Sequence, residues 1–175
     1  KRGWNVIRAS IDGFHNPKET RYRQGRDSAS GYYEDSFDYQ GLVAELLEPL
    51  KNNEPAYRAE VFDYRTEAKI DSKTRDAEPG SILIMEGVFL FRPEIVRFWD
   101  VKLFLDIGFE ESIARAVHRE SDKAHLGANK EIISKYKTRY IPGQQLYFEQ
   151  VNPRETADIV IDNRDFENPQ IVKKV

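Results

Sequence analysis

Residues 4–17, WNVIRASIDGFHNP, place an acid and a histidine directly after a short apolar run. Residues 6–11 have the length and β-branched content of a strand, and Asp12 and His15 follow its end. Taken alone, Asp-Gly between apolar residues indicates a hairpin turn. Because no second strand pattern follows in residues 16–27, the stretch instead favours the end of a parallel strand, where open α/β sheets bind ligands.

Three further apolar runs have strand length, and helical patterns lie between them. The runs are residues 82–85, 101–105 and 159–161, and the first two are apolar throughout apart from Lys102, which favours strands buried on both faces. The helical patterns include Leu42, Leu46, Leu47 and Leu50, and later Ile132, Ile133, Tyr136 and Tyr140. Strands that alternate with helices predict an α/β fold with a mostly parallel sheet and helices on both faces.

The composition is that of one folded domain over residues 1–175, with 39% hydrophobic and 33% charged residues. The net charge of -3 gives no global attraction to nucleic acid or to an acidic membrane. The absence of cysteine excludes disulfides and a cysteine nucleophile. No apolar run approaches the roughly 20 residues that span a bilayer, and no signal-peptide pattern occurs. We therefore expect a cytoplasmic protein without nucleic-acid or membrane partners.

Two polar segments are expected to be functional loops. Residues 15–36 carry charges, glycines and tyrosines without a sustained period, and we interpret them as a substrate loop. Residues 120–130 interrupt a long helical region with polar residues and a glycine, which is typical of the tip of a hinged lid.

A second acid, Glu86, follows the apolar run at 82–85, and each of two interpretations fits it. Four apolar residues that end in an acid have the general form of a Walker B element, in which the acid lies near Mg²⁺. Any strand can also end in an acidic turn. Arg115 and Arg119 are four residues apart, on one predicted helix face, and either clamp a phosphoryl group or form a solvated stripe with Glu111.

Other candidate site residues can equally have a purely structural role. Asp38 precedes a helical pattern and suits an N-cap, and Asp63 follows a short apolar stretch as turn residues do. Phe62 can stack on a base or pack in the core. His118 and His125 have no metal-ligand partners at useful spacing, so no structural metal site is assigned.

Taken in order, the motifs resemble the uridine kinase-like branch of the P-loop kinases, which includes uridine-cytidine kinases and phosphoribulokinase. The motifs are SIDGFH, RYRQGRDSASGYYEDSFD, YRAEVFDYRTE, ILIMEGVFLFRPE, LFLDIGFEESIARAVHRE, TRYIPGQQLYFEQVNP and ADIVIDN, from about residue 4 to about residue 164. The resemblance implies a P-loop NTPase-type three-layer sandwich with a helical lid at about residues 115–145. It also implies an ATP-dependent, Mg²⁺-dependent kinase that phosphorylates a hydroxyl of a small acceptor, first of all a nucleoside such as uridine.

The resemblance assigns roles residue by residue. Asp12 matches the catalytic base, and Glu86 matches the Walker B acid near Mg²⁺. The residues that match the surroundings of the acceptor are His15, Asp38, Phe62 and Asp63. Arg115 and Arg119 match arginines at the base of the lid that contact the phosphates of ATP. Separately, the basic stretch with Arg21, Arg23 and Arg26 would suit a phosphorylated acceptor.

The chain departs from the family pattern in three places. Around HLGANKE, residues 125–131, the lid lacks the usual Gly-Arg-Asp, and Glu67 stands where those enzymes have a histidine. No G-x-x-x-x-G-K-[ST] occurs in the sequence, which opens at the family's second strand, so we expect a longer polypeptide to carry the first strand and the phosphate loop. The alternatives are a non-catalytic ligand-binding module and a kinase for a phosphorylated sugar or other small metabolite. A homo-oligomer is compatible with the sequence.

Overall fold

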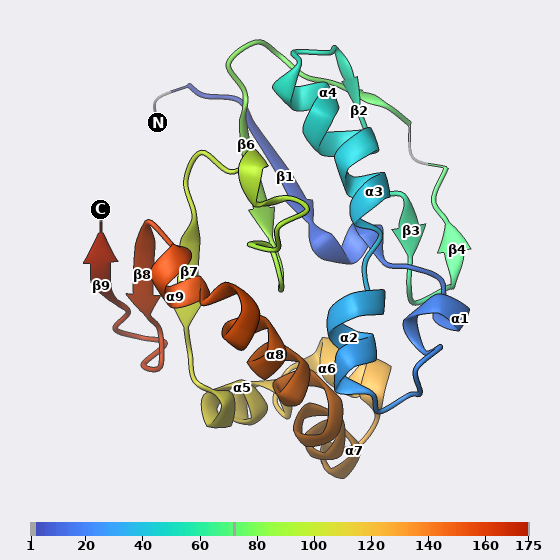
Figure 1. The fold of residues 1–175 in the computed structure, drawn as a ribbon, viewed down its shortest axis with the longest axis vertical. Helices are drawn as coiled ribbons and strands as arrows, with labels where there is room; N and C mark the ends of the chain where they lie inside the picture. The colour runs from blue at the N-terminus through green and yellow to red at the C-terminus, as the bar shows by residue number, and fades with distance from the viewer. Residues whose placement is uncertain (1–2, 72, 175) are drawn as a thin grey trace. The chain divides into compact units, whose positions relative to one another are not determined.

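The structure is a computed structural model that describes residues 3–71 and 73–174 (Figure 1). In this range the chain divides into two compact units. Unit 1 comprises residues 3–23 and 34–98, and unit 2 comprises residues 24–33 and 99–174. The chain therefore passes between the units three times, after residues 23, 33 and 98.

Unit 1 is built on two parallel strands. β1 (Val6–Ser10) pairs with β6 (Ile82–Glu86), from Val6 opposite Ile82 to Ser10 opposite Glu86. Both strands were predicted from their apolar runs. β1 continues directly into the 3-10 helix η1 (Ile11–Phe14), where the hydroxyl of Ser10 accepts a hydrogen bond of 3.3 Å from the Asp12 amide. Asp12 therefore lies in a capped helical turn and not in a hairpin.

The predicted leucine helix forms a continuous run in unit 1. It consists of α3 (Tyr39–Leu42), the π-helix η2 (Val43–Leu47) and α4 (Glu48–Lys51). Leu42 and Leu46 are fully buried, as their helical spacing requires. The wider π turn comes just before Pro49, whose ring lacks an N–H and crowds the carbonyl group one turn earlier.

Short elements complete unit 1. β2 (Ala56–Tyr57) pairs with β5 (Arg75–Asp76), and β3 (Phe62–Asp63) pairs with β4 (Ala68–Lys69), both antiparallel. The remaining elements are α1 (Lys18–Arg21) and the 3-10 helix η3 (Val96–Phe98). The expectation that residues 15–36 form an irregular loop was wrong, because α1 and α2 (Ala29–Asp35) lie there. Helices of four and seven residues are too short to produce a sustained period.

Unit 2 contains a three-stranded sheet in the order β7-β8-β9. β7 (Leu103–Asp106) and β8 (Ile159–Asp162) are parallel, with Asp106 opposite Asp162, and β9 (Gln170–Lys174) runs antiparallel to β8. The helices are α5 (Phe109–Ala116), α6 (Glu120–Leu126), α7 (Asn129–Lys135), the π-helix η4 (Tyr136–Tyr140), α8 (Ile141–Val151) and α9 (Pro153–Thr156). Gly127, at φ 97°, separates α6 from α7, which confirms a break within residues 120–130.

The prediction that the runs at 82–85 and 101–105 are buried on both faces was wrong. Ile84 is 50% exposed, and Leu103 and Leu105 are 46% and 51% exposed. Among the described strands β6 pairs only with β1, and β7 pairs only with β8, so each strand has one unpaired edge. No helix within residues 3–71 and 73–174 is both long and apolar enough to cross a membrane.

Candidate active site

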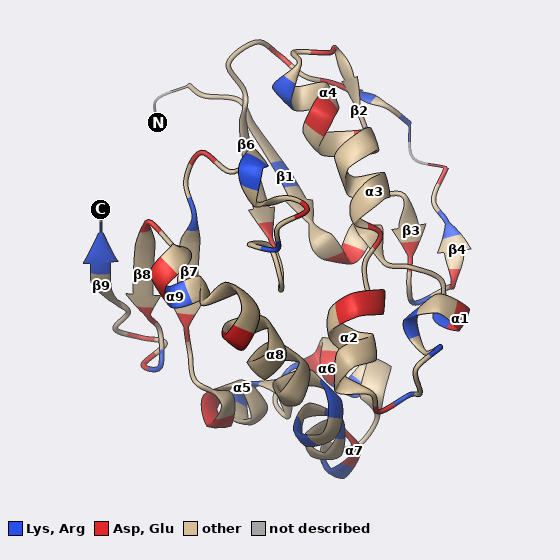
Figure 2. Cartoon of the chain, in the orientation of Figure 1, with Lys and Arg blue, Asp and Glu red and all other residues tan. Residues whose placement is uncertain are grey.

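Two acids meet at the carboxyl end of the parallel pair in unit 1. Ser10 and Glu86 are opposite each other in the last pair of the β1–β6 ladder, and Asp12 follows two residues later in η1 (Figure 2, acidic residues in red). The Asp12 side chain is 56% exposed, and Glu86 is also exposed. Within the part of the chain that the structure describes, the Glu86 carboxylate has no hydrogen bond or ion pair. It is therefore available to a ligand.

Two glycines allow the backbone to pack closely around Asp12. A Cβ at Gly87 would lie 2.2 Å from Cγ2 of the fully buried Ile11, and Gly87 has φ 144°. A Cβ at Gly13 would lie 2.7 Å from Cβ of Glu60. Gly13 is therefore needed for close approach, and not for a positive φ. Tight contacts on both sides fix the turn that carries Asp12.

His15 holds the backbone of Asp12. Its Nδ1 lies 2.9 Å from the carbonyl oxygen of Asp12, and because a carbonyl only accepts, Nδ1 carries the proton. The same nitrogen is 4.0 Å from Asp12 Oδ1. The imidazole contacts the rings of Phe37 and Tyr64, with centroid distances of 4.6 and 4.5 Å. The contact of Tyr64 with His15 was not predictable from the sequence, because the two residues are 49 positions apart in the chain.

Asp38 lies beside the same turn. Its amide donates a hydrogen bond of 2.7 Å to the carbonyl of Phe14, and its Oδ1 accepts one of 2.8 Å from the Gly41 amide. The N-cap role that its position suggested is therefore confirmed. One carboxylate oxygen engaged in this way leaves the other for further hydrogen bonds.

Phe62 and Asp63 have structural roles in the β3–β4 hairpin. The Asp63 carboxylate accepts hydrogen bonds of 2.9 Å from the Arg65 amide and 2.9 Å from the Thr66 hydroxyl. The Arg65 amide first, and then the Thr66 hydroxyl, lower the pKa of Asp63. Phe62 is only 7% exposed. This geometry favours the turn and core alternatives for these two residues.

The arginines near α1 are paired with carboxylates. Arg21, 7% exposed, forms an ion pair with Glu67, whose other oxygen accepts a hydrogen bond of 2.9 Å from the Lys18 amide. Arg23 binds Asp35 through two hydrogen bonds, and Nε lies 2.9 Å from Oδ2. Both guanidinium charges are therefore compensated within unit 1.

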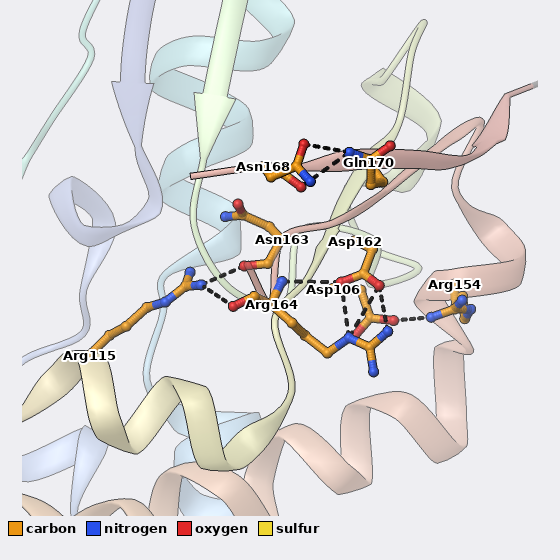
Figure 3. Close-up of polar contacts among 8 residues, drawn as sticks. All are labelled: Asp106, Arg115, Arg154, Asp162, Asn163, Arg164, Asn168 and Gln170. Carbon is orange, nitrogen blue, oxygen red and sulfur yellow. Dashed lines mark hydrogen bonds and ion pairs between the residues drawn. The ribbon is translucent and has the colours of Figure 1, made fainter. Parts of the chain in front are cut away.

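Arg115 and Arg119 of unit 2, which the resemblance places at the base of a lid, lie on either side of a helix break. Arg115 is on α5 and donates to the carbonyls of Asn163 and Arg164 (Figure 3). Arg119 is the N-cap residue of α6, and its Nη1 lies 3.1 Å from Asp122 Oδ2. The prediction that both share one helix face was wrong, because α5 ends at Ala116. After α5, hydrogen bonds between residues three apart, from the His118 amide to the Arg115 carbonyl and from the Arg119 amide to the Ala116 carbonyl, form a 3-10 type turn.

A second pair of acids ends the parallel strands of unit 2, but arginines already bind both (Figure 3). Arg154 pairs with Asp106, and Arg164 pairs with Asp162. The hydrogen bonds from Arg164 lower the pKa of Asp162 to about 2. In contrast to Glu86, these carboxylates therefore stabilise the end of the sheet.

Magnesium typically takes only one or two protein carboxylates, with water and phosphate oxygens as the other ligands. No group of three or more His, Asp or Glu side chains within the described ranges could hold a metal ion by itself. The exposed Glu86 carboxylate at a strand end fits such a shared coordination.

No family model matches the chain. The uridine kinase of Streptococcus uberis is 28% identical over 173 residues, which cover 90% of this chain and 79% of that protein. A chloroplastic uridine/cytidine kinase of Arabidopsis thaliana is 24% identical over 117 residues, 66% of this chain, and the chain spans only 24% of that relative's length.

A solved structure described as a possible uridine kinase from Bacillus stearothermophilus has the same fold. Its TM-score is 0.68 at 23% sequence identity, over 91% of this chain and 73% of that chain. The predicted α/β fold of the P-loop NTPase type is thereby confirmed. Together, the sequence relatives and the structure confirm the predicted resemblance of this chain to the uridine kinase-like P-loop kinases.

Proposed function

We propose that this chain is part of an ATP-dependent kinase that phosphorylates a hydroxyl of a neutral, nucleoside-like acceptor. The observation that carries the proposal is the pairing of β1 with β6, which brings Asp12 and Glu86 to the same carboxyl end. The relatives named uridine kinase support the same reaction class.

Asp12 is the catalytic base in this proposal. Its exposed carboxylate accepts the proton of the acceptor hydroxyl as that oxygen attacks the γ-phosphorus. The bond from the γ-phosphorus to the β,γ-bridging oxygen breaks, and ADP leaves. His15 keeps Asp12 in place through the backbone. Mg²⁺ held at Glu86 would neutralise charge on the phosphates.

The remaining roles follow from position. Asp38 and His15 border the turn of Asp12 and would bind the acceptor. Arg115 and Arg119 would contact the phosphates of ATP at the base of the lid. Such contacts would need the guanidinium groups to donate hydrogen bonds to phosphate oxygens as well as to their present partners.

The charge of the acceptor is inferred from the arginines of unit 1. A site for a phosphorylated acceptor needs cationic groups that are not already neutralised. Arg21 and Arg23 are instead compensated by Glu67 and Asp35. We therefore favour a neutral acceptor over a sugar phosphate.

A panel of acceptors tests the proposal. The full-length natural protein is incubated with ATP and Mg²⁺ and with either nucleosides or sugar phosphates, and ADP formation is measured. We expect turnover with at least one nucleoside. Turnover only with sugar phosphates would contradict the proposed acceptor class. No turnover with either group would contradict the proposed kinase activity.

A non-catalytic ligand-binding module is the second candidate, because the guanidinium groups of Arg115 and Arg119 already have partners. The two candidates differ in their response to ATP. A kinase with ATP at about 100 times its Kd gains about 2.7 kcal/mol of stability, whereas a module that does not bind ATP gains none. Thermal unfolding with and without ATP distinguishes them.

A further inference from the structure

Ten residues of the chain leave unit 1 and return to it. Residues 24–33, which we call the docking segment, pack with unit 2, whereas residues up to 23 and from 34 pack with unit 1. The segment contains a loop and the first part of α2. The segment therefore belongs to unit 2, and the residues on either side of it belong to unit 1.

Two cations of unit 2 hold the loop of the docking segment. Arg139 is 3% exposed, and its Nη1 donates to the carbonyl oxygens of Gly25, Arg26 and Ser28 at 3.3, 3.3 and 3.0 Å. Lys135 donates to the Arg26 carbonyl at 2.6 Å and pairs with Asp27 at 3.0 Å. Three carbonyls on one buried guanidinium nitrogen fix the path of the loop.

α7, η4 and α8 follow one another directly in the chain, and Lys135 and Arg139 belong to the first two of them. The helical part of the docking segment contacts η4 and α8. The rings of Tyr32 and Tyr140 lie 4.8 Å apart, and those of Tyr33 and Tyr147 lie 6.2 Å apart. A Cβ at Gly143 would lie 2.7 Å from Cδ1 of Tyr32, so the helix has no room for a side chain there. The contact residues Lys135, Arg139, Gly143 and Tyr147 recur every four positions and form one stripe.

Both ends of the docking segment lead into the candidate acceptor site. Arg23, the residue before it, is bound to Asp35, two residues after it. Asp35 and Ser36 accept hydrogen bonds from Asn16, at 3.0 and 2.9 Å. Asp38 follows and binds the turn that contains Asp12 through the Phe14 carbonyl.

We propose that Arg139 is a positioning residue for the acceptor site, and that it acts through the docking segment on Asp35 and Asp38. The proposal rests on the proposed kinase function for its kinetic readout, but its structural readout does not. Since Arg139 lies in the lid region, binding on the lid side and binding of the acceptor should be coupled, and the coupling is reciprocal.

The test compares four variants of the full-length protein. Arg139→Met removes the three hydrogen bonds, Arg139→Lys keeps a cation with three donors, and Gly143→Ala pushes on Tyr32 from the other side of the stripe. Lys137→Met is the matched control, because Lys137 is an exposed cation on the same turn. The acceptor KM, the ATP KM, kcat and the hydrogen exchange of backbone amides are measured.

We expect Arg139→Met and Gly143→Ala to raise the acceptor KM about tenfold, with kcat at saturating acceptor and the ATP KM changed less than about threefold. Arg139→Lys should recover part of the affinity, and Lys137→Met should behave as the unmodified protein. In the two disruptive variants, amides at 24–28 and also at 35–38 should exchange faster.

Two results would overturn the proposal. Faster exchange at 24–28 with unchanged exchange at 35–38 would show that the docking segment does not affect the position of Asp35 and Asp38. Equal effects of Lys137→Met and Arg139→Met on the acceptor KM would show that the loss of a positive charge, and not the loss of the Arg139 hydrogen bonds, weakens acceptor binding. If the unmodified protein has no kinase activity, the proposed function fails, while the exchange at 35–38 still decides whether Arg139 positions that stretch.

Discussion

Ser10 and Glu86 are opposite each other in the last pair of the parallel ladder between β1 and β6. This register places Asp12, two residues after Ser10, at the strand end where Glu86 also lies. The chemistry proposed for the chain depends on this one relationship, and three of the predictions below test it.

The substitution Asp12→Asn should lower kcat about 10²- to 10⁴-fold, because the amide cannot accept the proton of the acceptor hydroxyl. The dissociation constants of ATP and acceptor should change only a few-fold, since size and shape are kept. Steady-state kinetics and calorimetry measure both. Asp76→Asn, an exposed site on β5 of the same unit, is the control. Equal kcat values for the two variants would remove Asp12 from the reaction.

The substitution Glu86→Gln should shift the Mg²⁺ dependence of turnover. A neutral amide is a poorer ligand for a hard cation, so the Mg²⁺ concentration for half-maximal rate should rise about 10-fold or more. Part of the lost activity should return at high Mg²⁺. An unchanged Mg²⁺ titration with reduced kcat would argue that Glu86 acts elsewhere than at the metal.

The substitution Gly87→Ala should displace Ile11 and with it Asp12. The added Cβ would overlap Cγ2 of Ile11, which costs about 1–3 kcal/mol of folding free energy. Gly80→Ala is the control, because Gly80 also has a positive φ but open space around it. Denaturant unfolding and kcat are measured for both. We expect only Gly87→Ala to lower kcat, and the same loss in both variants would contradict the steric explanation.

The substitution Glu67→Ala should destabilise the protein by about 3 kcal/mol, because it leaves the nearly buried Arg21 charge without its carboxylate. Glu45→Ala removes the half-exposed partner of Arg58 and should cost at most about 1 kcal/mol. Urea unfolding of the two variants gives the difference. Similar losses would mean that the Arg21–Glu67 pair is as weak as a surface pair.

Asp162 should make folding stability depend on pH. Its pKa is about 2 in the folded protein, below the ordinary value of 3.8. A lowered folded-state pKa contributes stability that is fully present above the unfolded pKa and is lost as the pH falls through the folded one. Stability should therefore fall between about pH 4 and pH 2, and Asp162→Asn should reduce this slope. An NMR titration of Asp162 with a midpoint near 3.8 would contradict the pairing with Arg164.

The short apolar runs allowed the main strands to be predicted, because runs rich in aliphatic residues and bounded by polar ones are typical of strands. The β3–β4 hairpin was not predictable, since each strand has two residues. For Asp38 and Asp63 the sequence suggested a cap and a turn, but it did not decide between these roles and a ligand-binding one. The same carboxylate suits a cap, a turn or a ligand, and only its hydrogen-bond partners decide.

Contacts between residues distant in the sequence were the other feature that could not be predicted. Nothing near Arg21 in the chain indicates that its partner is Glu67, 46 residues later. The exposed faces of Ile84 and Leu105 differ from expectation for a related reason. An apolar run indicates a strand, but how many neighbours the strand has depends on the whole sheet.

The contacts of the docking segment also determine when it can fold. Lys135 and Arg139 lie 108 to 114 residues after the loop that they bind. At a synthesis rate of about 5–20 residues per second, the ribosome needs roughly 5–20 s more to deliver this helix after it has made the loop. During that time residues 24–33 emerge without their partners, so the candidate acceptor site is completed only after Arg139 has been made.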